Sequence, residues 1–285
     1  MTFAIGYLGP QGTYSEQAAE AYRQQLHGQG DTELKPYPSI LQVIQATADC
    51  SIDFAVVPVE NSIEGGVTVT LDALWQLPNL RIQHALIVPI SHALLTKASS
   101  LSSLEHIYSH PQALGQCQQW IKNNCPNADL IPTRSTTEVL GDLQKTTNTA
   151  AIASEWAAHL YDLPVIAHPI NDSPDNFTRF WVLGTQDSQQ GDFTSLAFSL
   201  PVNAPGALLT PLQIMSRASI NLSRIESRPT KRSLGEYLFF LDLEASLSEA
   251  KVQQSLQALQ SCTETLRIFG SYDASTHAYN LSKHG

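Results

Sequence analysis

Residues 3–26 read FAIGYLGPQGTYSEQAAEAYRQQL. The stretch begins with a short apolar run at Phe3–Leu8, whose length and composition predict a buried strand. A turn with two glycines follows, and Thr13 and Glu16 form a capping box that predicts a helix over Tyr14–Leu26. One strand followed by one helix is the repeating element of an α/β fold.

The same alternation of apolar runs and helical patterns continues to about residue 185. It predicts strand–helix–strand units with mostly parallel sheets, and it excludes an all-β or an all-helical fold. Further strands are expected at Asp53–Val59, Arg81–Ile90, His106–Ser109, Ala150–Ala153, Pro164–His168 and Phe177–Leu183. Further helices are expected at Ile40–Ala48, Val67–Gln76, Ala113–Asn123, Thr136–Gln144 and Glu155–Tyr161.

The long apolar run at residues 81–95 indicates how this N-terminal region, residues 1–185, is divided. The run is long enough to cross from one lobe to another, and Phe177–Leu183 would then be the return strand. We therefore expect two lobes. Lobe 1 comprises about residues 1–80 and 170–185, and lobe 2 about residues 81–169.

The pattern changes after residues 186–192, a polar segment without apolar periodicity that we interpret as a linker. Residues 193–275 are predicted to form a βαββαβ module, the ferredoxin-like order, and residues 276–285 a tail. The expected elements are Phe193–Leu200, Gly206–Arg217, Ile220–Ser227, Gly235–Glu244, Leu247–Ser261 and Thr265–Ser271.

Composition narrows the classes of function. The net charge of −10 argues against a nucleic-acid partner, which would need a basic patch, and implies that local donors must hold any anionic substrate. No apolar stretch is long enough for a transmembrane helix, and no signal peptide is evident, so we expect a cytoplasmic protein without a membrane partner. The four cysteines and nine histidines show no metal-binding spacing, and we expect no metal and no cofactor.

Polar residues follow several predicted strands at the point where each strand ends. Ligands of α/β sheets bind outside the carboxyl ends of strands, so these residues are candidates for a binding site. Turn and capping roles explain the same residue types, and a lone histidine at such a place is more often structural, so both interpretations stay open. The candidates are Thr13, Asn61, Ser62, Ser109, His110, Gln112, Ser135 and Thr136.

A further stretch, residues 176–180, reads NFTRF. Thr178 and Phe180 project to one face of the predicted strand, and Arg179 projects to the other. If Thr178 faces a cleft, Arg179 needs a partner elsewhere, and a structural ion pair then explains it as well as contact with a substrate does.

Six motifs in order give a specific resemblance. GPQGTYSEQAA, VPVENSIEGG, YSHPQALGQC and NFTRFWVLG resemble the prephenate dehydratases, and GALLTPL with INLSRIESRPTK resembles the ACT module that accompanies them. The resemblance runs from about Ala4 to Tyr272 and implies a catalytic region with the two-lobed fold of periplasmic binding proteins. It also implies decarboxylation and dehydration of prephenate to phenylpyruvate. No chorismate mutase helices precede Met1, so one activity is expected.

The motifs also imply roles for single residues. Thr178, Asn61, Ser62 and Gln112 correspond to catalytic positions, while Thr13, Ser109, His110, Ser135, Thr136, Arg179 and Phe180 are expected to contact the substrate. Two segments of the ACT module are expected to bind L-phenylalanine as an allosteric ligand, between paired modules of a homodimer or homotetramer. They contain Gly206, Ala207, Leu208, Leu209, Asn221, Leu222, Glu226, Ser227 and Arg228.

Loss of CO₂ and of the C4 hydroxyl group makes an aromatic ring, so the enzyme mainly has to hold two carboxylates and help hydroxide leave. We expect Thr178 to donate a hydrogen bond to the departing oxygen.

Tyr14 stands where the family usually has phenylalanine, and Thr68-Val69-Thr70 is an unusual entry to the next helix. Two alternatives stay open: an arogenate dehydratase with the same motifs, and a non-catalytic sensor of an aromatic metabolite.

Overall fold

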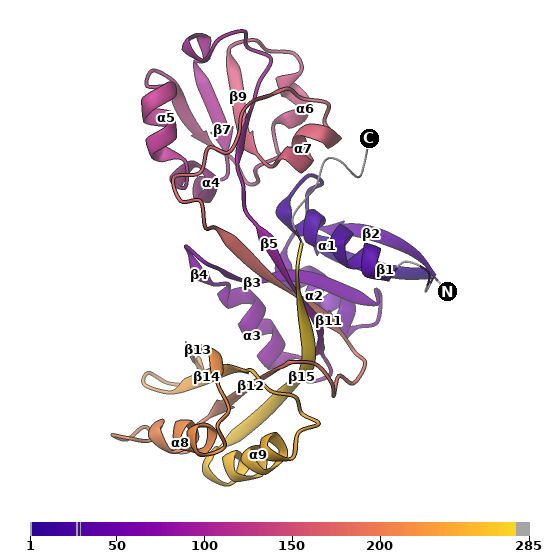
Figure 1. The fold of residues 1–285 in the computed structure, drawn as a ribbon, viewed down its shortest axis with the longest axis vertical. Helices are drawn as coiled ribbons and strands as arrows, with labels where there is room; N and C mark the ends of the chain where they lie inside the picture. Colours follow the sequence, from indigo (N-terminus) through magenta and orange to yellow (C-terminus); the bar gives the residue numbers. More distant parts are fainter. Residues whose placement is uncertain (1, 27, 29, 278–285) are drawn as a thin grey trace.

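The computed structural model describes residues 2–26, 28 and 30–277, and the last part of the expected tail, residues 278–285, lies outside this range. The described chain is a mixed α/β protein built on two sheets (Figure 1). The larger sheet has ten strands, of which nine follow the order β13-β14-β12-β15-β5-β11-β3-β1-β2, with β4 paired to β3. The smaller sheet has five strands in the order β10-β6-β9-β7-β8.

Strands and helices alternate along the described N-terminal region, as the apolar pattern predicts. Its strands are β1 Thr2–Leu8, β2 Asp31–Tyr37, β3 Phe54–Asn61, β4 Gly65–Gly66, β5 Arg81–Pro89, β6 Ala93–Leu95, β7 His106–Ser109, β8 Asp129–Pro132, β9 Thr149–Ala153, β10 Val165–Ala167 and β11 Phe177–Gly184. Its helices are α1 Tyr14–Gln25, α2 Ile40–Ala48, α3 Thr68–Gln76, the 3₁₀ turn Leu101–Ser103, α4 Pro111–Gly115, α5 Gln118–Asn124, α6 Leu140–Leu143 and α7 Glu155–Leu160.

The run at residues 81–95 does cross between the two sheets. Its first part is β5, which pairs with β11 in the large sheet, and its last part is β6, which pairs with β9 and β10 in the small sheet. The chain returns through β11, which lies between β3 and β5. The expected lobe boundary at residue 81 is therefore wrong, because β5 belongs to lobe 1 and the chain leaves that lobe at Ile90, after Pro89 ends the strand.

Several expected helices are shorter than their patterns. The helix expected over Ala113–Asn123 is two helices, α4 and α5, which Gln116 and Cys117 separate. The helix expected from Thr136 begins only at Leu140, because Glu138 accepts a hydrogen bond from the Arg134 amide and holds a turn there. Strands β2 and β8 were not expected, since both are edge strands that carry proline, β2 is mostly polar and β8 has only four residues.

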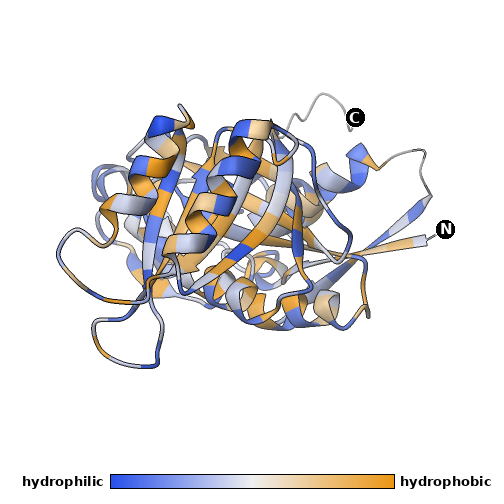
Figure 2. Cartoon of the chain, turned by 90° about the horizontal axis from the view of Figure 1, so that it is seen from below, coloured by the Kyte–Doolittle hydropathy of each residue, from blue (hydrophilic) through white to orange (hydrophobic). Residues whose placement is uncertain are grey.

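Residues 193–276 form the C-terminal module, and its elements follow the expected βαββαβ order. They are β12 Phe193–Ser199, α8 Leu209–Arg217, β13 Leu222–Pro229, β14 Tyr237–Leu243, α9 Ala250–Cys262 and β15 Thr265–Thr276. The four strands are antiparallel to their neighbours, and α8 packs beside α9 against the sheet. Figure 2, seen from the end that carries this module, shows hydrophobic residues gathered in the strands and hydrophilic ones on the outer parts of the helices and on the loops.

The last strand joins the module to lobe 1. The strand expected over Thr265–Ser271 continues to Thr276, and Asp273–Thr276 pairs in parallel with β5. Ser271 also donates its backbone N–H to the carbonyl of Ser188, 2.8 Å away, so part of the expected linker is held against β15. The ten-stranded sheet therefore runs without a break from the C-terminal module into lobe 1.

The main hydrophobic core crosses the same boundary. Buried residues of lobe 1, among them Ile82 and Trp181, form one cluster with Phe240 and Phe269 of the C-terminal module. The rings of Phe240 and Phe269 are stacked with their centroids 5.9 Å apart. Because the two parts share a core, we expect them to unfold together.

Replacing Phe240 with alanine tests this coupling. The truncation leaves a cavity in the shared core and should lower the free energy of unfolding by about 3–5 kcal/mol. Urea unfolding followed by circular dichroism and by tryptophan fluorescence should give one transition at a lower midpoint. An early transition of the module alone, with the rest of the chain unfolding at the wild-type midpoint, would contradict a shared core.

Candidate active site

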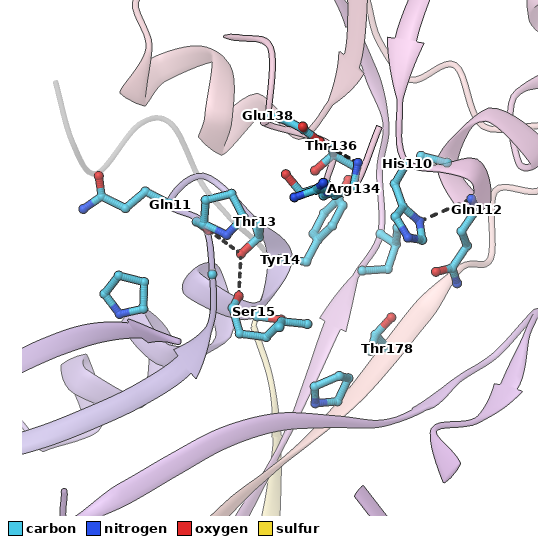
Figure 3. Close-up of a pocket in the computed structure, with 18 of the residues that line it drawn as sticks. Gln11, Thr13, Tyr14, Ser15, His110, Gln112, Arg134, Thr136, Glu138 and Thr178 are labelled. Atoms are coloured by element: carbon cyan, nitrogen blue, oxygen red, sulfur yellow. Dashed lines mark hydrogen bonds between the residues drawn. The ribbon is translucent and has the colours of Figure 1, made fainter. Parts of the chain in front are cut away.

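A cavity of about 920 Å³ lies where the two sheets of the N-terminal region meet. Residues from the carboxyl ends of β1, β3 and β7 line it, together with the crossing segment and the turn after β8. Figure 3 shows polar side chains entering the cavity from both lobes. Of the expected site residues, the lining includes Thr13, Asn61, His110, Gln112, Ser135, Thr136 and Thr178.

Thr178 lies on β11 and is 8% exposed. Its Oγ1 accepts a hydrogen bond of 2.9 Å from Nδ2 of Asn61, which stands opposite it on β3. No acceptor within the described chain binds the Thr178 hydroxyl hydrogen. The geometry therefore leaves this hydrogen free to be donated to a ligand in the cavity.

Asn61 is held firmly from both ends of its amide. Its Oδ1 accepts the backbone N–H groups of Ile63 and Glu64, each at 3.0 Å. Its Nδ2 also lies 2.9 Å from Oδ1 of Asn176. Because Oδ1 has two donors, the amide cannot flip without losing both bonds, and Nδ2 must face Thr178.

A buried amide and imidazole chain continues behind this pair. Asn176 donates to Oε1 of Gln116 at 2.9 Å, and the same oxygen lies 3.1 Å from Nε2 of His92. Since Oε1 can only accept, Nε2 carries the proton and Nδ1, 3.3 Å from the Tyr14 hydroxyl, does not. Burial lowers the pKa of His92 to about 4, so its ring is neutral at neutral pH.

His110 and Gln112 enter the cavity from lobe 2 at the start of α4. His110 is the N-cap of this helix, and its Nδ1 accepts the backbone N–H of Gln112 at 3.3 Å. Burial lowers the pKa of His110, so its neutral form dominates near neutrality, with Nε2 as a donor. The side chains of both residues can bind a ligand, while His110 also keeps its capping role.

In the turn before α1, two backbone amides are already bonded within the protein. Glu16 Oε2 accepts the backbone N–H of Gly12 at 2.6 Å, and also the indole N–H of Trp156 from lobe 2 at 3.0 Å. The Thr13 hydroxyl lies 3.0 Å from the carbonyl oxygen of Pro10 and accepts from the Glu16 amide at 3.3 Å. The turn thus binds the protein's own carboxylate and joins the two lobes.

Four residues expected at the site lie outside the cavity lining. The Ser62 hydroxyl accepts the N–H of Phe177 at 2.9 Å, and the Ser109 hydroxyl donates to the carbonyl of Ile152 at 2.6 Å. Phe180 is 2% exposed and packs under α1 in the core of lobe 1. The structure therefore does not bring Ser62, Ser109, Arg179 and Phe180 to the cavity lining with the other expected site residues.

Arg179 projects away from Thr178, as strand alternation predicts, and takes part in an ion-pair cluster. Its guanidinium lies 3.2 Å from Oδ2 of Asp242 in the C-terminal module and 3.6 Å from Oε2 of Glu60. Asp242 is 1% exposed and also receives a 2.8 Å bond from Arg224. Of these two neighbours on β11, Thr178 thus contacts the cavity and Arg179 contacts the C-terminal module.

Several lining or supporting residues were not found from the sequence. Asn176 and Gln116 gave a weak signal, since both lie inside or next to motifs that were noted. His92 and Arg134 gave none, because a single histidine or arginine in a loop has no pattern to mark it. The additional lining residues with polar side chains are Gln11, Tyr14, Ser15, Tyr37, His92, Gln116, Arg134, Glu138 and Tyr161.

The residues expected to bind an allosteric ligand lie in two segments of the C-terminal module. Gly206, with φ of +80°, and Ala207 form a turn that leads through Leu208 into α8 at Leu209. Asn221 and Leu222 stand at the start of β13. On the same strand Arg228 binds Asp72 of α3 at 3.1 Å, and Glu226 lies against Gly66 of β4. Glu226 and Arg228 therefore contact lobe 1, and Ser227 between them is exposed.

Over residues 2–26, 28 and 30–277, no group of three His, Cys, Asp or Glu side chains is placed to hold a metal ion. The helices in that same range are too short or too polar to cross a membrane. The polar side chains that line the cavity carry hydroxyl, amide, imidazole, guanidinium and carboxylate groups.

Comparisons with known proteins agree on one family. The family model described as prephenate dehydratase matches residues 5–188. The chain is 37% identical over 276 residues to a prephenate dehydratase of Lactococcus lactis, covering 94% of this chain and 96% of that one. It is also 37% identical over 271 residues to a bifunctional chorismate mutase/prephenate dehydratase of Aquifex aeolicus, covering 94% and 73%.

The chain belongs to the prephenate dehydratase family. The crystal structure of prephenate dehydratase from Arthrobacter aurescens in complex with L-Phe superposes with a TM-score of 0.84 at 35% identity. That match covers 96% of this chain and 90% of that one, and so includes the C-terminal module. Members of the family are hydro-lyases, and the resemblance of the four motifs within residues 5–188 to the prephenate dehydratases is confirmed.

The buried His92 ring gives this member of the family a testable pH dependence. Its pKa falls from 6.5 to about 4 on folding, so between these values the unfolded state binds a proton that the folded state does not. The free energy of unfolding should therefore fall as pH is lowered through this window, by about 1.4 kcal/mol per unit. Urea unfolding at several pH values should show a weaker decline for His92→Gln than for wild type, and equal declines would contradict the burial.

Proposed function

We propose that the cavity binds prephenate and releases phenylpyruvate, CO₂ and water, with Thr178 as the donor to the departing oxygen. The C–C bond to the ring carboxylate breaks and its electron pair enters the ring. The C4–O bond breaks at the same time, its electron pair stays on the oxygen, and the hydroxide that leaves takes a proton from solvent to become water. The observation that carries the proposal is the free hydrogen of Thr178, whose oxygen is already bonded to Asn61.

Thr178 acts by electrostatic stabilisation in this mechanism. An alcohol is too weak an acid to transfer its proton fully, but a buried, fixed hydroxyl dipole stabilises the charge that develops on the leaving oxygen. Asn61 turns the dipole toward the cavity, and Asn176 and Gln116 hold Asn61. His110 and Gln112 lie on the opposite lobe, where they can bind the substrate and help exclude water.

Replacing Asn61 with aspartate tests the direction of this dipole. The new carboxylate has nearly the same shape but accepts where Nδ2 donated, so the Thr178 hydroxyl should turn and donate to it instead of to the substrate. We expect kcat for phenylpyruvate formation to fall by roughly 10²-fold, with a small change in KM.

Asn79→Asp is the matched control for this variant, because Asn79 is exposed and its amide binds the Ala48 carbonyl far from the cavity. Both variants should fold, as judged by circular dichroism. Near-wild-type kcat in folded Asn61→Asp would contradict the proposed role of the pair, whereas absence of turnover in wild type would contradict the proposed function itself.

We also propose that the C-terminal module is an ACT module that binds L-phenylalanine and lowers activity. Support comes from the GALL and ESRP motifs at residues 206–209 and 226–229. A cavity of about 370 Å³ lies between residues 200–203 and 232–237, the segments next to these two motifs. Two modules paired in a homodimer or homotetramer would complete the ligand site.

The ion-pair cluster at Arg179 offers a route from that site to Thr178. Asp242 on β14 binds Arg179, and Thr178 is the preceding residue of the same strand. Arg228 on β13 binds Asp72 of α3, which follows the Asn61 turn. A change in the position of β13 and β14 would therefore move both residues of the Asn61–Thr178 pair.

Arg179→Met tests this route. The variant removes the guanidinium and keeps the apolar part of the side chain. Calorimetry should show L-phenylalanine binding with a Kd within about threefold of wild type, while inhibition of phenylpyruvate formation should weaken by about tenfold, a coupling loss of about 1.4 kcal/mol. Unchanged inhibition would contradict the route, and absence of binding to wild type would contradict the ligand.

A further inference from the structure

We propose that Arg134 is the residue that anchors the substrate, and that it binds the carboxylate of the pyruvyl side chain, which is not lost as CO₂. The inference rests on the proposed function and adds to it a specific partner for one end of the substrate. The geometry of the cavity, the state of the other donors and the chemistry of the reaction each support it.

Arg134 is a cation in the cavity without an ionic partner. It stands after β8 and is the one lysine or arginine among the lining residues that the structure describes. Its guanidinium forms no hydrogen bond or ion pair with any side chain in residues 2–26, 28 and 30–277, and only its backbone N–H is bonded, to Glu138 at 2.6 Å. On a chain with a net charge of −10, a free cation at this place favours an anionic ligand.

Arg134 also lies at the correct end of the cavity. In Figure 3 the guanidinium lies near Thr136 and Glu138, and Thr178 stands well apart from it across the cavity. In prephenate the C4 hydroxyl group and the carbon that bears both the carboxylate and the pyruvyl group are at opposite ends of the ring. With the hydroxyl group at Thr178, the carboxylates point toward Arg134.

Two groups of the turn before α1 that could bind a carboxylate are already engaged. The Gly12 amide binds Glu16, and the Thr13 hydroxyl lies within hydrogen-bond distance of two backbone carbonyl groups of its own turn. The Ser135 hydroxyl accepts from the Thr137 amide at 3.4 Å, which leaves its hydrogen free to donate next to Arg134. The planar guanidinium of Arg134 is the charged donor at this end, and it matches a carboxylate with two parallel hydrogen bonds.

The reaction decides which carboxylate Arg134 holds. The ring carboxylate loses its charge as CO₂ forms, so an ion pair with it would stabilise the ground state more than the transition state and would slow the reaction. The pyruvyl carboxylate keeps its charge from substrate to product. An ion pair with that group lowers KM without cost to kcat, and it persists in bound phenylpyruvate.

Arg134→Gln separates these possibilities. For a lost charge-assisted contact we expect KM for prephenate to rise about 10- to 100-fold with kcat within about twofold of wild type. The inhibition constant of phenylpyruvate should rise by the same factor, because the product retains the pyruvyl carboxylate. Arg134→Lys keeps the charge without the planar fork and should fall between the two proteins in both measurements.

Lys122→Gln is the control, since Lys122 is an exposed cation on α5 outside the cavity lining, and it should change neither constant. Unchanged KM and product inhibition in folded Arg134→Gln would overturn the inference. A changed kcat with unchanged product inhibition would also overturn it, since a higher kcat would assign Arg134 to the ring carboxylate and a lower kcat would assign it to catalysis. Wild type that binds phenylpyruvate but does not convert prephenate would instead count against the proposed function.

Discussion

The pairing of β11 with β3 on one side and β5 on the other is the constraint on which the rest of the structure depends. It returns the chain from lobe 2 to lobe 1 and closes the cavity. It also places Thr178 opposite Asn61, so that one hydrogen bond fixes the direction of the hydroxyl group. Because side chains alternate along a strand, the next residue, Arg179, must point to the opposite face, where Asp242 of the C-terminal module binds it.

The buried amide side chains around Thr178 hold the residues of the site in fixed positions. Asn61, Asn176 and Gln116 are each at most 8% exposed, and each bonds the next. A buried polar group without a partner costs about 1–3 kcal/mol, so moving one member of the chain would be opposed by the others. The same burial keeps His92 neutral and keeps bulk water from the Thr178 dipole, which strengthens its effect on a developing charge.

Much of the fold follows from local patterns, and the differences have physical causes. Apolar runs located β1, β3, β5, β9 and β11, and the crossing at residues 81–95 followed from length alone. Edge strands β2 and β8 were not predicted, because β2 is mostly polar and β8 is too short, at four residues, to show a pattern. The continuation of β15 into lobe 1 was not predictable, since the pairing of Asp273–Thr276 with β5 depends on a contact about 190 residues away in sequence. The candidate site was also predicted only in part. Strand alternation correctly placed Thr178 and Arg179 on opposite faces of β11. The hydroxyls of Ser62 and Ser109 bind backbone groups, and no sequence signal distinguished these residues from Asn61 and Gln112, which line the cavity.

The central claim is that the hydroxyl group of Thr178, rather than its volume, promotes departure of the C4 oxygen. The most direct measurement is kcat for phenylpyruvate formation by Thr178→Ser and Thr178→Ala, compared with wild type under saturating prephenate. Serine keeps the hydroxyl group within reach of Asn61 and should retain kcat within about tenfold, whereas alanine should lose roughly 10²- to 10³-fold with little change in KM. Equal losses in the two variants, or near-wild-type turnover in the alanine variant, would contradict the claim.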